Sequence, residues 1–272
     1  MNAIIKQLRI MRAAAGVTYK EWAAYRTHSM VSIFVGPVYY LVQISIWRAV
    51  YASQEQLRGM TLPDMLAYYG AAALIGYLTM DFADWNLQML INTGKYINFS
   101  LRPVHHRFFA LSQKIGHRTL GLLYEFIPVF IIFTAVFGVN VIPAAPLWAA
   151  VSVTLSFFMN FYINYSIGLA GFWLTKTGGL RNVLGVLVNI MSGMVIPLTF
   201  FPEAFQKVMF FLPFQYITYV PSMVFTGRYM LGGVPLSVPQ IVGVQFVYVL
   251  AVAALSEVLY RKGQKRYMGV GI

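Results

Sequence analysis

The sequence predicts an all-α integral membrane protein with six transmembrane helices, an N-terminal amphipathic interfacial helix and an outer re-entrant helical hairpin before the last span. Of the 272 residues, 59% are hydrophobic and only 10% are charged, a balance typical of proteins that fold in a bilayer. A helix needs roughly 20 apolar residues to cross the hydrocarbon layer, and the chain has several charge-poor runs of that length. The third observation is that most Lys and Arg residues fall on one side of the predicted spans.

The predicted spans are separated by short loops that leave no room for a soluble domain. They cover residues 28–51, 65–90, 118–138, 146–174, 181–201 and 239–260. The transmembrane domain is therefore expected over 28–262, with an inner coupling loop at 92–118, an outer hairpin at 202–238 and a basic cytoplasmic tail at 263–272.

Residues 1–27 carry apolar side chains at helical spacing, including Ile4, Leu8 and Met11, with Lys6 and Arg9 on the other side. This pattern predicts an amphipathic interfacial helix. A cleavable signal peptide would place its basic cluster before one apolar core, and that pattern is missing. The alternative is a soluble lead-in to the first span.

The basic residues give the orientation, because cytoplasmic loops carry an excess of Lys and Arg. With the N-terminus in the cytoplasm, sixteen of the twenty Lys and Arg residues fall on the inner side. The other four are Arg48, Arg58, Lys207 and Arg228. This asymmetry favours an even number of spans with both ends in the cytoplasm, and it explains the net charge of +12 without nucleic-acid binding.

Residues 202–238 are apolar enough to suggest a seventh crossing, but prolines argue against it. Pro213 would interrupt a helix that begins at Glu203, and Pro221 follows. The uninterrupted pieces are about 10 residues, or about 15 Å of helix, which is too short to span. We therefore expect two short helices that form a re-entrant outer hairpin, with Glu203 and Lys207 as an i,i+4 pair.

The inner loop combines a proline suited to the first turn of a helix with an amphipathic pattern. From Pro103 to about Gln113, apolar Val104, Phe108 and Leu111 are interleaved with basic side chains. The pattern predicts a short helix lying flat on the cytoplasmic side. An ordinary basic loop held at anionic lipid is the alternative.

Two stretches carry a resemblance to a known family. They are Gly94 to Pro103, which includes Leu101-Arg102-Pro103, and Ser192 to Pro202, which is followed by Leu212-Pro213-Phe214. Together with the order of the elements over nearly the whole chain, they resemble the permease subunits of the ABC type-2 exporter family. The Leu-Arg-Pro loop looks like the branch whose permeases often work as unlike pairs.

The resemblance implies that the inner loop forms a coupling helix, which docks on a separate nucleotide-binding ATPase subunit. The coupling residues would be Arg102, Pro103, Val104, His105, His106, Arg107, Phe108 and Leu111. It also implies a second permease as partner, in a homodimer or a heterodimer, and outward transport across the cytoplasmic membrane. Membrane lipid is a further partner, and no nucleic acid is expected.

The chain lacks the phosphate-loop pattern Gly-x-x-x-x-Gly-Lys-Ser/Thr, so no cofactor is expected on it, and ATP and Mg would be bound by the partner subunit. The aromatic content of 16% fits a hydrophobic or amphipathic substrate such as a lipid or drug. An ion channel or a secondary transporter is the alternative function, although a secondary transporter should show internal repeats.

Small and polar residues recur every four residues along two predicted spans, where they would let helices approach closely. Helix packing is the simpler interpretation, and a translocation path at the subunit interface is the functional one. The residues concerned are Ser156, Asn160 and Asn164 in the fourth span and Asn189, Gly193 and Pro197 in the fifth.

Asp81, Asp84 and Glu125 are carboxylates within the predicted spans. Intramembrane carboxylates are usually functional, so a proton or cation site is one interpretation. Asp81 lies some 22 Å from the start of its span at about 1.5 Å per residue, near the cytoplasmic boundary. We therefore expect each carboxylate to form an ion pair with an inner basic residue.

An intramembrane enzyme is a distant alternative. The four histidines, His28, His105, His106 and His117, do not form a His-Glu-x-x-His zinc motif, and no metal site is expected. The chain has no cysteine, which excludes thiol catalysis. Ser192 lies in the outer part of its span, away from every histidine, so a Ser–His pair is not expected.

Overall fold

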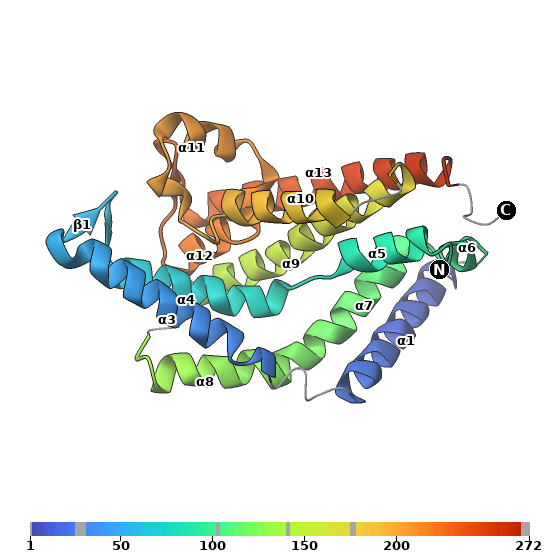
Figure 1. Cartoon of the computed structure of the whole chain (residues 1–272), viewed down its shortest axis with the longest axis horizontal. Helices are drawn as coiled ribbons and strands as arrows, with labels where there is room; N and C mark the ends of the chain where they lie inside the picture. Colours follow the sequence, from blue (N-terminus) through green and yellow to red (C-terminus); the bar gives the residue numbers. More distant parts are fainter. Residues whose placement is uncertain (1, 25–30, 102–103, 140–141, 175–177, 268–272) are drawn as a thin grey trace.

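The computed structural model describes residues 2–24, 31–101, 104–139, 142–174 and 178–267. Most helices run along the long axis of the molecule, with β1 at one end and α6 at the other (Figure 1). The main helices are α1 (Asn2–Ala24), α3 (Val35–Val50), α4 (Leu62–Thr79), α5 (Ala83–Asn92), α7 (His106–Gly121), α8 (Ile127–Ala135), α9 (Pro146–Gly168), α10 (Gly178–Met191) and α13 (Val238–Gln264).

Within this described part, three helices are long and apolar enough to cross a membrane. They cover His106–Ala135, Pro146–Phe172 and Val238–Gln264, and Gly178–Met191 is a shorter apolar helix. The second and third of these agree closely with the predicted helices 146–174 and 239–260. Both begin with a local signal, because each has a proline in the first turn, where a missing N–H costs nothing.

The second predicted span, 65–90, is not one helix, and here the prediction was wrong. α4 ends at Thr79 and α5 begins at Ala83, so Met80–Phe82 interrupt the helix. The carboxylate of Asp81 accepts a hydrogen bond from the Ala83 N–H at 2.9 Å and so caps the start of α5.

α4 begins outside the predicted span with a reciprocal cap between Thr61 and Asp64. Asp64 also pairs with Arg228. Burial raises the pKa of Asp64, but the hydrogen bonds from Thr61 and the charge of Arg228 outweigh this effect, and the pKa lies below its usual value.

The short flat helix predicted from Pro103 to Gln113 is instead the first part of a long one. Arg102 and Pro103 lie outside the described residues, and α7 begins at His106. Nothing between His106 and Gly121 breaks the helix. It continues through η2, a π-turn at Leu122–Phe126, into α8, so the helix starts twelve residues before the predicted span 118–138.

The fifth predicted span, 181–201, ends about ten residues early, because α10 stops at Met191. Gly193 has φ +80, a conformation that suits glycine and ends a helix. The carbonyls of the unwound residues 192–195 accept hydrogen bonds from elsewhere in the fold. The donors are the Tyr68 hydroxyl to Gly193 at 2.7 Å, Tyr39 to Met194 at 2.8 Å, Tyr69 to Val195 at 2.9 Å and the Tyr219 N–H to Ser192 at 2.8 Å.

The stretch 202–238 contains two short helices, α11 (Glu203–Phe210) and α12 (Tyr219–Phe225), separated by the 3-10 turn η5 (Pro213–Tyr216). Pro213 therefore interrupts the helix as expected. Lys207 Nζ lies 2.9 Å from Glu203, so the predicted i,i+4 pair is present. The strand hairpin of β3 (Met230–Leu231) and β4 (Val234–Pro235) was not predicted from the sequence; its Gly232-Gly233 turn has positive φ. A second hairpin, β1 (Gln56–Leu57) and β2 (Met60–Thr61), precedes α4.

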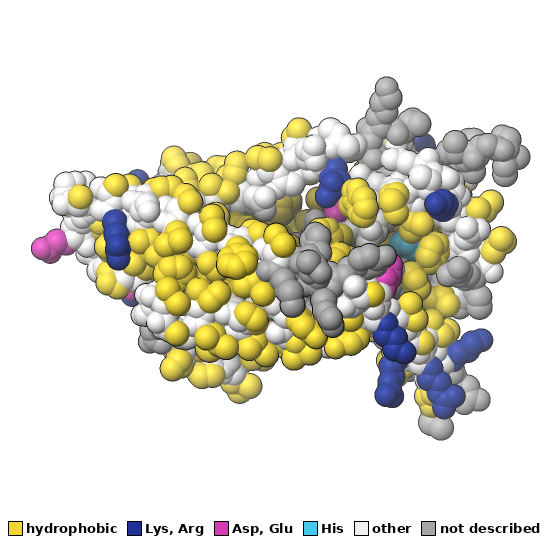
Figure 2. Space-filling model, turned by 60° about the horizontal axis from the view of Figure 1, so that its bottom comes forward, with side chains coloured by type: hydrophobic (Ala, Val, Ile, Leu, Met, Phe, Trp, Pro, Cys, Tyr) yellow, Lys and Arg dark blue, Asp and Glu magenta, His cyan; other side chains and the backbone are white. Residues whose placement is uncertain are grey.

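The buried side chains form two clusters, one large cluster around α4, α9 and α12 and a smaller one at the end near α6 (Ile97–Ser100). Outside them, many large apolar side chains remain exposed, including Val38 and Val42 on α3 and Ile131 on α8. Figure 2 shows such side chains covering the middle of one face, with charged groups toward its two ends. An apolar band between charged ends is typical of a protein surrounded by lipid.

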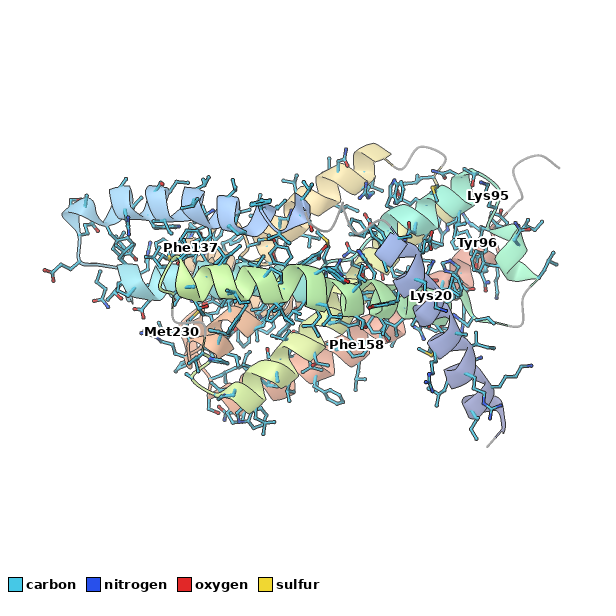
Figure 3. The ribbon with its side chains drawn as sticks, turned by 90° about the horizontal axis from the view of Figure 1, so that it is seen from below. Lys20, Lys95, Tyr96, Phe137, Phe158 and Met230 are labelled. Atoms are coloured by element: carbon cyan, nitrogen blue, oxygen red, sulfur yellow. The ribbon has the colours of Figure 1, made fainter. Side chains whose placement is uncertain are left out.

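α1 leaves the rest of the bundle at an angle (Figure 3). Its C-terminal half packs on α7, where Gly116 allows a close crossing, since a Cβ there would overlap the Ala15 carbonyl. Leu8 on α1 is exposed, and the interfacial location of this helix stays a prediction.

Candidate functional site

The charged residues of α7 meet α4 and α5 at the break between them. Lys114 Nζ lies 3.2 Å from Asp81, and both side chains are almost fully buried, at 2% and 3% exposure. Lys114 also donates to the Phe157 carbonyl on α9 at 2.8 Å. One lysine on α7 therefore joins the start of α5 to α9.

Arg118, one turn further along α7, binds the other side of the break. Its Nη1 donates to the Tyr77 carbonyl at 2.6 Å and to Glu125 in the π-turn at 3.1 Å. Glu125 also accepts a hydrogen bond from Ser32 at 2.9 Å. Because α4 ends, no N–H of a following helical turn donates to the Tyr77 carbonyl, and Arg118 supplies this donor instead.

Asn160 on α9 completes this set of caps. Its side-chain amide donates to the Thr79 carbonyl at 2.7 Å. Buried carbonyls without donors are costly in a low-dielectric interior, so the break depends on these side chains from other helices.

The third carboxylate, Asp84 on α5, pairs with Arg181 on α10. Each of Asp81, Asp84 and Glu125 therefore has a Lys or Arg partner, as expected from the sequence. Neither these partners nor the helix break that they surround was predicted from the sequence.

Of the predicted coupling residues that the structure describes, two are buried, three are half-buried and one is exposed. His106 is buried, with Nδ1 3.0 Å from the Tyr165 hydroxyl, and Leu111 is also buried. Arg107 pairs with Glu257 on α13 at 3.2 Å and donates to the Ala253 carbonyl at 2.9 Å. Val104 is half-buried, and Phe108 is 37% exposed.

His105 caps α7, because its Nδ1 accepts from the Arg107 N–H at 3.3 Å. Its Nε2 lies 3.4 Å from Glu257. Burial lowers the pKa of His105 despite the opposing charge of Glu257. The neutral ring suits both contacts, since one nitrogen accepts and the other donates.

The two most exposed apolar side chains of the inner loop, among those that the structure describes, lie on α6 and directly after it. Ile97 is 41% exposed and Leu101 is 81% exposed. This loop lies at one end of the molecule, where Figure 3 labels Lys95 and Tyr96. The signal for this exposed segment in the sequence is the apolar content of the stretch Gly94–Pro103.

The residues proposed for a translocation path divide into two groups. In α9 they make contacts inside the chain: Ser156 donates to the Ile217 carbonyl, Asn160 to Thr79, and Asn164 to Asn160 at 2.9 Å. Gly193 and Pro197 are buried after the end of α10. Asn189 differs, because it is exposed on α10, a helix with no buried residue.

Among the described residues, no group of three or more His, Asp or Glu side chains could hold a metal ion. The three long apolar helices and the band of exposed apolar side chains are typical of an integral membrane protein. The model of the ABC-2 family transporter protein matches residues 38–271, so the chain belongs to this family of membrane transport components. Comparison with curated proteins and with solved structures found no match.

Proposed function

We propose that the protein is the permease subunit of an ATP-driven exporter that moves a hydrophobic or amphipathic substrate across the cytoplasmic membrane. The family match over residues 38–271 is the observation that carries this proposal. ATP and Mg would be bound by a separate nucleotide-binding subunit, because the chain has no phosphate-loop sequence.

In this proposal the six spans are α3, the interrupted pair α4 and α5, the continuous pair α7 and α8, α9, α10 and α13. The end with α6 is cytoplasmic and the end with β1 is external. The charges support this orientation, since α1, the α6 loop and the end of α13 are rich in Lys and Arg. α11 and α12 would form the outer hairpin, and both termini would lie in the cytoplasm.

Docking of the ATPase is proposed at α6 and Leu101 rather than along α7. Arg107 is engaged with Glu257 and Ala253, so it supports the inner end of α7 instead of offering a free charge. Displacement of the α6 loop would move α7, whose Lys114 and Arg118 hold the break between α4 and α5. This chain of contacts supports a path from ATP binding to movement of the spans.

A second permease, identical or related, is proposed to contact α10. An asparagine exposed to lipid lacks partners for its amide, whereas the same side chain can hydrogen-bond across a helix interface. The exposure of Asn189 and the absence of buried residues along α10 support this location.

The test is photo-crosslinking in the native host membrane from two leucines at opposite ends of the molecule. Leu101 and Leu147 are similarly exposed, at 81% and 73%. A photoreactive amino acid at position 101 is expected to capture a polypeptide whose mass-spectrometric sequence contains a phosphate loop. The same residue at position 147 is expected not to capture it.

Purified crosslinked complex should hydrolyse ATP, and Leu101→Glu should reduce its recovery without lowering the amount of permease in the membrane. Capture of the same ATPase from position 147, or of none from position 101, would contradict the proposed docking end.

A further inference from the structure

A cavity of about 900 Å³ lies between α1, the break after α4, α5 and α7. Its lining is mainly aromatic and aliphatic, and includes Trp22, Phe82, Trp85 and Phe109. Its size falls within the range of roughly 300–1,000 Å³ that is usual for sites binding drug-sized molecules. The cavity is therefore a candidate binding site for an organic ligand.

The charges at the cavity wall do not cancel completely. Lys114 pairs with Asp81, and Arg181 pairs with Asp84 directly behind the wall. Glu21 on α1 also lines the cavity, and no ion pair of Glu21 occurs within the part of the chain that the structure describes. Among the described residues, Glu21 is thus the one Asp, Glu, Lys or Arg side chain of the lining without an ion pair, and it is exposed.

Three of the four basic residues of α1 line a different hollow. Lys20 precedes Glu21 in the chain, but it lines a separate groove together with Arg9 and Arg12. Figure 3 labels Lys20 where α1 crosses the bundle. The two faces of α1 therefore differ in charge, with the cations on the groove and the carboxylate on the cavity.

Aromatic rings beside Glu21 suit a positive charge. Trp22 and Phe82 are stacked with ring centroids 6.5 Å apart, and Trp85 is 50% exposed. The face of an indole ring attracts a cation. A carboxylate next to such rings favours an organic cation over an organic anion of the same shape.

We propose that this cavity binds a hydrophobic organic cation bearing aromatic groups, with Glu21 opposite its charge and Trp22 and Trp85 against its rings. That the cation is cargo rests on the proposed function, but binding itself requires only this chain. The two ideas can therefore fail separately: the crosslink at Leu101 tests the transporter, and binding to the purified chain tests the cavity.

The experiment uses tetraphenylphosphonium and tetraphenylborate, two ions of the same shape and opposite charge. The full chain, reconstituted in phosphatidylcholine nanodiscs, is titrated with each ion while tryptophan fluorescence is recorded, and empty nanodiscs are subtracted. Tetraphenylphosphonium is expected to reach half-saturation at a concentration about tenfold lower than tetraphenylborate.

Glu21→Gln should abolish this preference, and Trp85→Phe should reduce the fluorescence change. Glu55→Gln is the matched control, because Glu55 lies in the exposed turn before β1, far from the cavity, and it should keep the preference. Thermal unfolding checks that each variant is folded. Equal affinity for the two ions, failure to bind either ion, or a preference that survives Glu21→Gln would overturn the proposal.

Discussion

Replacement of Lys114 by methionine tests whether α7 holds the break between α4 and α5. The substitution keeps most of the side-chain volume and removes the charge 3.2 Å from Asp81. It also removes the donor to the Phe157 carbonyl at 2.8 Å. Asp81 would then be a buried carboxylate with a backbone hydrogen bond but no opposite charge in contact.

Removal of one partner from a buried ion pair typically costs about 3–5 kcal/mol, because the remaining charge stays desolvated. Both side chains are at most 3% exposed, so screening by water gives little relief. For a chain of this size, about 3 °C per kcal/mol is expected, and the midpoint of thermal unfolding should fall by about 10 °C.

The double variant Lys114→Met with Asp81→Asn removes both charges and should recover part of this loss. Buried pairs exchanged for neutral groups are often nearly neutral in stability, and the coupling between the two sites should be about 1–3 kcal/mol. The midpoint is measured in the same detergent for the single and double variants. Hydrogen exchange of the α5 amides should increase in Lys114→Met and be partly restored in the double variant.

Lys207→Met provides the matched control. Lys207 also pairs with a carboxylate, but its side chain is 63% exposed, and no resolvable change in midpoint is expected. The reasoning would be refuted if Lys114→Met changed the midpoint no more than Lys207→Met, or if the double variant were no more stable than Lys114→Met alone.

Three further predictions concern other parts of the fold. Tyr68→Phe removes the hydroxyl that donates to the unwound segment after α10, so it should lower the free energy of unfolding by about 1–2 kcal/mol. Tyr124→Phe is the control, because this ring is 37% exposed, and it should lower the free energy of unfolding less. Asp64→Asn should lower the midpoint at pH 7. The pKa of Asp64 is lowered in the folded state, so its contribution to stability is complete above the ordinary pKa of about 3.9 and is lost as the pH falls through the lowered value. The difference in unfolding midpoint between Asp64→Asn and wild type should therefore shrink below about pH 4. The chain has no cysteine, so Leu101→Cys and Glu55→Cys each introduce a unique thiol. An impermeant maleimide added to intact cells should label only position 55. Labelling of position 101 would contradict the proposed orientation.

The helices that could be predicted are those with local signals. The helix from Pro146 has a proline in its first turn and an apolar run of spanning length, and Pro213 divides the outer stretch for reasons visible within a few residues. These features follow from chain chemistry alone.

The break at Met80–Phe82 contains neither glycine nor proline, and its local signal is limited to Asp81, which caps the start of α5. It is stabilised by Arg118 and Asn160, which are 41 and 81 residues away from the carbonyls that they cap. A single sequence does not show which distant side chains meet. The same reason explains why the ion pairs were expected but their partners were not identified, and why the contacts of His106 with Tyr165 and of Arg107 with Glu257 were not predicted.

The π-turn at Leu122–Phe126 sets the angular relation between the two halves of one long helix. In an uninterrupted α-helix, positions eleven residues apart, such as Arg118 and Val129, lie on nearly the same side. Each residue of an α-helix turns the chain by about 100°, and a π-turn has more residues per turn, so it offsets these two positions. The π-turn therefore fixes how far the side of α7 that faces the ion pairs is rotated from the side of α8 that enters the apolar core. Deletion of one residue within Leu122–Phe126 would keep the helix continuous and rotate the α8 surface relative to the α7 surface by about 100°, away from the apolar core.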